Sequence, residues 1–224
     1  MLAHQLTQKK NKMITEIIKP INLLRGTHND TAKTGQGCFM NVIAYLNSEP
    51  QITDQSDCVC YVVRPIAIWL NDYLKDEERH LMIPFIERAM GSRSNDKNEV
   101  IRRVKLVVKF SNIAAEYFES AEYAKSAKYT ESAKYTESAA AYVAKSAEYA
   151  AEYAKYAAKY AAKYAKYAAE YAVYAESAEY ATIIRKTLID AAFEFLDNAL
   201  PKEIKIEKVV VKRAKELMAI NTED

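Results

Sequence analysis

One segment, residues 114–181, constrains the fold of this chain more than any other. Its 68 residues hold 25 Ala and 14 of the chain's 17 Tyr, and they contain no Gly, Pro or Cys. Ala is the strongest helix former, and Lys and Glu, which fill most of the remaining positions, follow closely. The helix-breaking residues are in fact absent from the whole stretch between residues 92 and 200. We therefore expect an all-α protein.

The second half of this segment has three distinct faces when it is drawn as an α-helix. Its Tyr residues recur every three or four positions and fall in one stripe about 80° wide. A line of charged residues lies beside the stripe, and Ala covers much of the remaining surface. The stripe consists of Tyr153, Tyr156, Tyr160, Tyr164, Tyr167, Tyr171 and Tyr174. The Lys residues beside it are Lys155, Lys159, Lys163 and Lys166.

The first half of the segment follows a different rule. The run SAEYAK-SAKYTE-SAKYTE has a period of six, so successive Tyr residues turn by about 240° and scatter around a helix axis. Ser and Thr also lower helix propensity there. We therefore expect the weakest helical stretch, or a break, around residues 129–138. Without a break, residues 114–181 would form a helix of about 100 Å.

The size of the Tyr stripe indicates that something covers it. A buried Tyr removes about 150–250 Å² from water, so seven of them amount to roughly 1,000 Å². The largest apolar patch of a soluble monomer is usually about 300–600 Å². We expect either the chain's own helices or another subunit to cover the stripe. A passive low-complexity spacer and a specific binding surface are the alternatives.

The other segments predict a three-part organisation. Residues 1–112 are expected to form a small helical domain, residues 113–181 the Ala/Tyr-rich repeat helix, and residues 182–224 C-terminal helices that pack with the first part. Pro84 is expected to kink or divide one helix, and Gly91 to end it. The segment SRSND (residues 92–96) offers N-cap candidates for the helix that follows it. The expected helices cover residues 38–49, 64–74, 77–91, 98–118, 182–200 and 202–220, although IKIEKVVV within the last range could also be a strand.

Charge and composition exclude several classes of protein. The net charge is only +2, and no concentrated basic footprint for duplex DNA is present beyond a basic N-terminus at residues 1–27. No stretch approaches 18 apolar residues, and residues 1–13 have no apolar signal core. The odd number of cysteines does not resemble a secreted disulfide framework. We expect a cytoplasmic protein that does not enter a membrane.

Three cysteines are the strongest candidates for a chemical site. Cys38, Cys58 and Cys60 lie in one region of the sequence and could supply thiolates to a tetrahedral zinc ion. The fourth ligand would be His28, His80 or Asp57. Packing as small buried side chains is the plainer alternative, since free Cys is commonly buried. A redox-active or nucleophilic thiol is a third possibility.

Other polar clusters give weaker signals. His80 stands beside Glu77, Glu78 and Arg79, which could act as an acid/base cluster or as a solvated helix start. Asp72 is expected to be a cap or an ion-pair partner. No residue is assigned a catalytic role, and enzymatic activity is not predicted. The Lys and Tyr residues side by side in the second half of the repeat would also suit single-stranded nucleic acid.

Four blocks between Gly35 and Arg93 carry a resemblance. They are G-x-G-C-F-M-N-V-I-A-Y-L-N-S-E-P, D-x-x-x-C-V-C, P-I-A-I-W-L-N-D and L-M-I-P-F-I-E-R-A-M-G-S-R. Together they resemble a family of uncharacterised proteins from bacteria and their phages. The resemblance implies an Ala-rich, sometimes Tyr-rich, helix and a short amphipathic C-terminus, and it implies no known reaction or cofactor. This chain departs from the family's D-H-P-x-C-x-C-P segment, because residues 54–61 lack the His and both Pro.

Three functions follow from these patterns. The preferred one is a non-catalytic structural or interaction protein that uses the Ala/Tyr-striped helix for self-association or for binding a protein partner. The second is a nucleic-acid-binding accessory protein that uses the Lys/Tyr stripe. The third is a metal- or thiol-dependent enzyme centred on the three cysteines.

Overall fold

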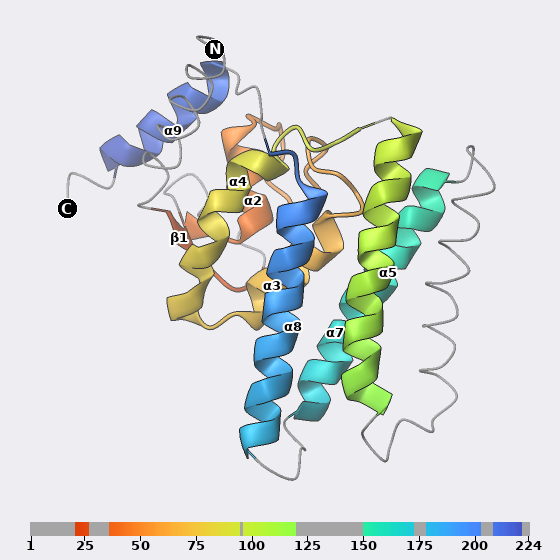
Figure 1. Cartoon of the computed structure of the whole chain (residues 1–224). Coiled ribbons are helices and arrows are strands. Elements are labelled where there is room, and N and C mark those ends of the chain that lie inside the picture. Colours follow the sequence, from red (N-terminus) through yellow and green to blue (C-terminus); the bar gives the residue numbers. More distant parts are fainter. Residues whose placement is uncertain are drawn as a thin grey trace, which may run out of the picture. The chain divides into compact units, whose positions relative to one another are not determined.

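The computed structural model describes residues 21–26, 36–94, 96–119, 150–172, 178–202 and 208–220 (Figure 1). Apart from loops and one pair of two-residue strands, these residues form helices, which confirms the all-α prediction. The break expected at residues 129–138 lies outside the described residues. None of the described helices is long and apolar enough to cross a bilayer.

The chain divides into two compact units. The first consists of Met1–Cys60, Asn71–Arg93 and Leu200–Asp224, and the second of Tyr61–Leu70 and Ser94–Ala199. Helix α3 (Arg64–Tyr73) supplies residues to both. The three-part division expected at residues 112 and 181 stays a prediction.

The first unit is built around one short buried helix. Strand β1 (Asn22–Leu23) pairs in parallel with β2 (Gln36–Gly37), and helix α2 (Phe39–Leu46) follows directly. All eight residues of α2 are buried, and seven of them are hydrophobic, Asn41 being the polar one. Helices α4 (Ile83–Ala89) and α9 (Lys208–Ile220) both contact it.

Proline and glycine set the helix ends in this unit as the sequence predicts. The 3-10 helix η2 (Asp76–Met82) ends where α4 begins, and Pro84 lies in the first turn of α4, where its missing N–H costs nothing. Gly91 follows α4 with φ of 72°, a conformation that favours glycine. The expected division at Pro84 and the end at Gly91 are therefore confirmed.

A buried asparagine joins the elements of the first unit. The Asn71 Oδ1 accepts a hydrogen bond of 3.1 Å from the Phe39 N–H at the start of α2, and its Nδ2 donates to the Leu24 carbonyl at 2.9 Å. The Asn71 carbonyl in turn accepts a bond of 2.8 Å from the Nε of buried Arg79. The Asn71 side chain thus satisfies backbone groups of two other segments, and Arg79 satisfies the Asn71 carbonyl, as buried polar groups require.

The second unit contains three long helices that pack along one another. They are α5 (Lys97–Glu119), α7 (Ala150–Ala172) and α8 (Ala178–Ala199). Helices α5 and α7 run in the same direction, and α8 runs in the opposite direction (Figure 1). The Ala/Tyr repeat therefore supplies the end of α5, all of α7 and the start of α8, as separate packed helices rather than one continuous rod.

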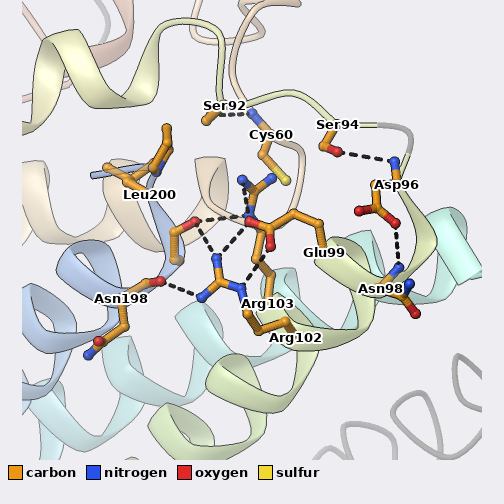
Figure 2. Close-up of polar contacts among 12 residues, drawn as sticks. Cys60, Ser92, Ser94, Asp96, Asn98, Glu99, Arg102, Arg103, Asn198 and Leu200 are labelled. Carbon is orange, nitrogen blue, oxygen red and sulfur yellow. Dashed lines mark hydrogen bonds and ion pairs between the residues drawn. The ribbon is translucent and has the colours of Figure 1, made fainter. Parts of the chain in front are cut away.

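Side chains cap the ends of these helices. Asp96 begins α5, since its Oδ1 accepts a bond of 2.9 Å from the Asn98 N–H, which confirms the N-cap expected in the SRSND segment. Near the same end of α5, Arg102 and Arg103 point at the last turn of α8, which runs antiparallel to α5 (Figure 2). The Arg102 Nη1 donates to the Asn198 carbonyl at 2.6 Å, and the Arg103 Nε to the Ala199 carbonyl at 2.9 Å. Cations at a helix C-terminus stabilise the helix dipole.

Three aromatic rings pack together in the core of the second unit. The ring of Trp69 lies 5.8 Å from that of Phe110, which lies 6.3 Å from that of Phe195, both in tilted arrangements. Such geometry is favourable for aromatic pairs.

Candidate functional site

The Ala face of α7 is the face that lies against the rest of the second unit. Its inward residues are almost completely buried, and α5 and α8 are the helices that contact α7. Alanine has no side chain beyond Cβ, so it permits a close approach of helix axes. The buried residues of this face are Ala157, Ala158, Ala161, Ala162, Ala165, Ala168 and Ala169. From Ala157 to Ala169, where the structure describes burial, the Ala face is thus part of the chain's own core.

The opposite face of α7, which we call the outer face, carries the lysines of the repeat. Tyr156 on this face leaves 48% of its surface exposed. Tyr160 and Tyr167 are half-buried. The exposed lysines are Lys155, Lys159, Lys163 and Lys166. The helix therefore turns its small residues inward and its cations outward, with the described tyrosines along the boundary.

Two of the tyrosines show how the stripe is arranged. The Lys163 Nζ lies 5.6 Å from the ring centroid of Tyr167, a cation–π contact within the outer face itself. Tyr156, in contrast, is among the most exposed large hydrophobic side chains of the described residues. The side chains of Tyr153, Tyr164 and Tyr171 and the whole of Tyr174 lie outside the described structure. The expected covering of the stripe is thus incomplete at Tyr156.

Charge is distributed unevenly along the outer face. Between residues 153 and 169 there are four Lys and no acidic residue, so this stretch carries a formal charge of +4. At its end the Lys166 Nζ lies 3.7 Å from the Glu170 carboxylate. Within the described part of the chain, this is the one ion pair that any of the four lysines forms. The face is consequently a line of exposed cations.

The cysteines predicted as metal ligands occupy separate structural positions in the first unit. Cys38 is the N-cap of α2, where its Sγ accepts a bond of 3.4 Å from the Asn41 N–H and donates to the Asn41 Oδ1 at 3.1 Å. Cys60 is fully buried. Among the described residues, no three His, Cys, Asp or Glu side chains gather closely enough to hold a metal ion. The zinc hypothesis gains no support from them, and His28 lies outside these residues.

Cys58 has the most polar surroundings of the three. Buried Ser56 donates a hydrogen bond to the Glu49 carboxylate, and its Oγ lies 3.1 Å from the Cys58 Sγ. Because the single Ser56 proton is used in the bond to Glu49, the thiol is the donor toward Ser56. Burial raises the pKa of the Cys58 thiol above its ordinary value of 9.0, and burial raises the pKa of Cys38 likewise. Both cysteines are therefore held as thiols, which opposes nucleophilic chemistry.

Residues from each of the four resemblance blocks contact one another in the first unit, where Asn71 and Asp72 are the members of the third block. Asn71 of the third block binds the start of α2, which belongs to the first block. The Ser92 hydroxyl of the fourth block accepts a bond of 2.9 Å from the Cys60 N–H of the second block (Figure 2), and the Arg93 N–H donates to the Cys58 carbonyl at 3.1 Å. These motif residues make polar contacts that join separate segments of the first unit.

The remaining candidate residues make hydrogen bonds within the first unit. The Asp72 Oδ1 accepts a bond of 2.8 Å from the N–H of Gly26 in the loop that follows β1, which is a contact between segments and not a helix cap. The Glu78 carboxylate accepts from the Lys75 N–H at 2.9 Å, and exposed His80 lies with its Nδ1 2.7 Å from the Glu77 carbonyl. The structure therefore joins Glu78 and His80 into helix-end contacts rather than one acid/base cluster.

Sequence reasoning missed two buried arginines, Arg79 and Arg103. Their exposed fractions are 4% and 2%, and each binds a main-chain carbonyl of another segment. From the sequence, Arg79 could not be distinguished from a solvated helix residue, because the carbonyl that it binds is eight residues away.

No family model, curated protein or solved structure matches this chain.

Proposed function

We propose that this chain is an interaction protein that binds another protein through the outer face of α7. The observation that carries the proposal is the division of α7 into a buried Ala face and an exposed Lys/Tyr face. The Ala face supports the fold. The outer face combines a half-exposed ring, Tyr156, with long cationic side chains, and aromatic rings are enriched at protein interfaces. In the first unit, by comparison, Asn71 and Ser92 are used in hydrogen bonds between the unit's own segments.

A photo-crosslinking experiment tests this proposal. Benzoylphenylalanine replaces Tyr156 in the full chain, produced in the cells that carry its gene, and adducts are identified by mass spectrometry after irradiation. The matched control replaces Ile183 of α8, because its exposed fraction of 47% is close to that of Tyr156, which is 48%. Protein adducts at position 156 in clear excess over position 183 are expected. Equal yields at the two positions, or none, would contradict the proposal.

Single-stranded nucleic acid is the second candidate ligand for this face. The observation that favours it is the repeated Lys–Tyr pairing, with Lys155 beside the exposed ring of Tyr156. Binding of a labelled oligo(dT) to the full chain is measured by fluorescence anisotropy at several salt concentrations. A linear fall of log affinity with log salt concentration would support this candidate. Absence of binding at low salt would eliminate it.

A further inference from the structure

We propose that the outer face of α7 binds an acidic protein surface, one that presents a line of carboxylates, rather than a second copy of α7. This inference rests on the proposed function, because it names the chemistry of the partner for the same face. Three observations carry it. They are the spacing of the lysines, the absence of acidic residues from the sequence between residues 153 and 169, and the way in which the described tyrosine rings are already engaged.

The lysines form a straight and regular row. Lys155, Lys159 and Lys163 are each four residues apart, and Lys166 follows after three, so all four fall on one side of α7. At 1.5 Å per residue the row is about 16 Å long. All four side chains are exposed. A partner helix with acidic residues at the same spacing would match this row along three turns.

The row is electrostatically unfavourable in the free protein. Like charges four residues apart destabilise a helix by a few tenths of a kcal/mol per pair. The flanking units of the repeat avoid this cost, because Glu148, Glu152 and Glu170 take the position before Tyr that Lys occupies in the row. A face that only needed to stay hydrated could have used the same mixture. A carboxylate-bearing partner removes the repulsion and adds attraction.

A second copy of the same face does not fit this requirement. In a twofold dimer the same patch meets itself, so the Lys row of one chain would face the Lys row of the other. Glu170 is the acidic residue described on this side of α7, and it already lies 3.7 Å from Lys166. The complementary charge must therefore come from a different surface.

The tyrosine rings favour a protein over a single nucleic-acid strand. Sequence-tolerant binding of a strand uses successive rings with open faces on which bases stack. Lys163 lies over the ring of Tyr167, and Tyr160 is half-buried. Among the rings whose exposure the structure describes on this face, Tyr156 alone is largely open. The face thus offers a row of cations with one open ring.

The test measures binding of a defined polycarboxylate to the full chain. Fluorescently labelled poly-L-glutamate is the acidic probe and labelled oligo(dT) is the nucleic-acid probe, both followed by anisotropy at low and moderate salt. The row variant changes four residues, Lys155→Gln, Lys159→Gln, Lys163→Gln and Lys166→Gln. The control variant removes the same number of exposed lysines elsewhere, by Lys105→Gln, Lys186→Gln, Lys212→Gln and Lys215→Gln. Gln and Lys have similar helix propensity, and circular dichroism verifies that both variants stay helical.

The expected result is selective. The row variant is expected to bind poly-L-glutamate at least about ten-fold more weakly, because four exposed ion pairs that each contribute a few-fold multiply. The control variant should stay within about two-fold of the wild type. Equal losses in the two variants, or tighter binding of oligo(dT) than of poly-L-glutamate, would overturn the inference. Adducts at position 156 without polycarboxylate binding would reject this inference alone, whereas loss of both results would reject the proposed function too.

Discussion

Cys58 shows at the scale of a single residue how packing decides chemistry. Its sequence position in Cys-x-Cys suggested a metal ligand or a reactive thiol. In the structure it lies in partly buried surroundings, with the Ser56 oxygen 3.1 Å from its sulfur. Burial raises the pKa of this thiol, so the thiolate that metals and electrophiles require is disfavoured.

The reactivity of Cys58 gives the first prediction. Its alkylation by iodoacetamide should be slow at neutral pH and should rise to a midpoint above 9.0, the ordinary thiol pKa. The rate is measured against pH for the Cys58 peptide by mass spectrometry, with a short unfolded peptide of the same sequence as control. A midpoint for the folded chain below that of the peptide would show that the site favours the thiolate instead.

Glu99 is the carboxylate on which two arginines converge. Its Oε1 lies 2.6 Å from the Arg102 Nη2 and 2.9 Å from the Arg103 Nη2, and Arg103 is buried. The hydrogen bond from Arg102 holds the pKa of Glu99 below its ordinary value of 4.5. Because the folded pKa is lowered, the stabilisation is complete above pH 4.5 and is lost as the pH falls through the folded pKa.

The second prediction concerns this carboxylate. Glu99→Gln should destabilise the chain by about 1 kcal/mol at neutral pH, the usual contribution of such a charge-assisted bond near a surface. The free energy of unfolding is measured in urea at neutral pH and well below the folded pKa. The difference between wild type and variant should shrink at the lower pH, because Glu99 is then protonated in both states. A difference that stays constant with pH would mean that Glu99 acts through packing alone.

Helix α7 shows what periodicity can and cannot predict at the scale of an element. The sequence indicated a helix with an Ala face, a Tyr stripe and a Lys line, and all three lie on α7 where the structure describes it. Which face turns inward does not follow from periodicity. The area of the Tyr rings favours burying the stripe, whereas the close approach that Ala permits favours burying the Ala face. The second effect dominates at Ala157–Ala169, and Tyr156 stays about half exposed.

Helix ends were predictable where a residue with a specific backbone preference marks them. Pro84, Gly91 and the N-cap of α5 were all placed from sequence. The buried arginines were not, because their partners are carbonyls of other segments, up to 96 residues away for Arg103 and Ala199. Contacts between a side chain and a distant main chain leave no local signal.

The third prediction tests which face of α7 supports the fold. Ala161→Leu should destabilise the second unit by about 1–3 kcal/mol, because Ala161 is fully buried and has no room for a larger side chain. Its neighbour on the outer face gives the matched control, since Lys159→Leu should change stability by less than about 0.5 kcal/mol. Urea unfolding followed by circular dichroism measures both. Equal effects at the two positions would contradict the inward orientation of the Ala face.

At the scale of the whole chain, the two units differ in how their polar and charged residues are used. The first unit contains three of the four resemblance blocks and the end of the third, and Asn71 and Ser92 are used there in contacts between its own segments. The second unit contains the repeat, and its α7 presents the exposed lysines. We therefore propose that the second unit, through the outer face of α7, binds the partner protein, and that the first unit has a structural role.

The fourth prediction maps that activity directly. Lysine acetylation rates are measured residue by residue in the full chain, with and without saturating poly-L-glutamate. The account predicts that protection is concentrated at Lys155, Lys159, Lys163 and Lys166, while Lys105 and Lys186, which are also exposed, react at nearly unchanged rates. Protection spread evenly over all exposed lysines, or absent from the four on α7, would contradict the claim that the outer face of α7 is the binding surface.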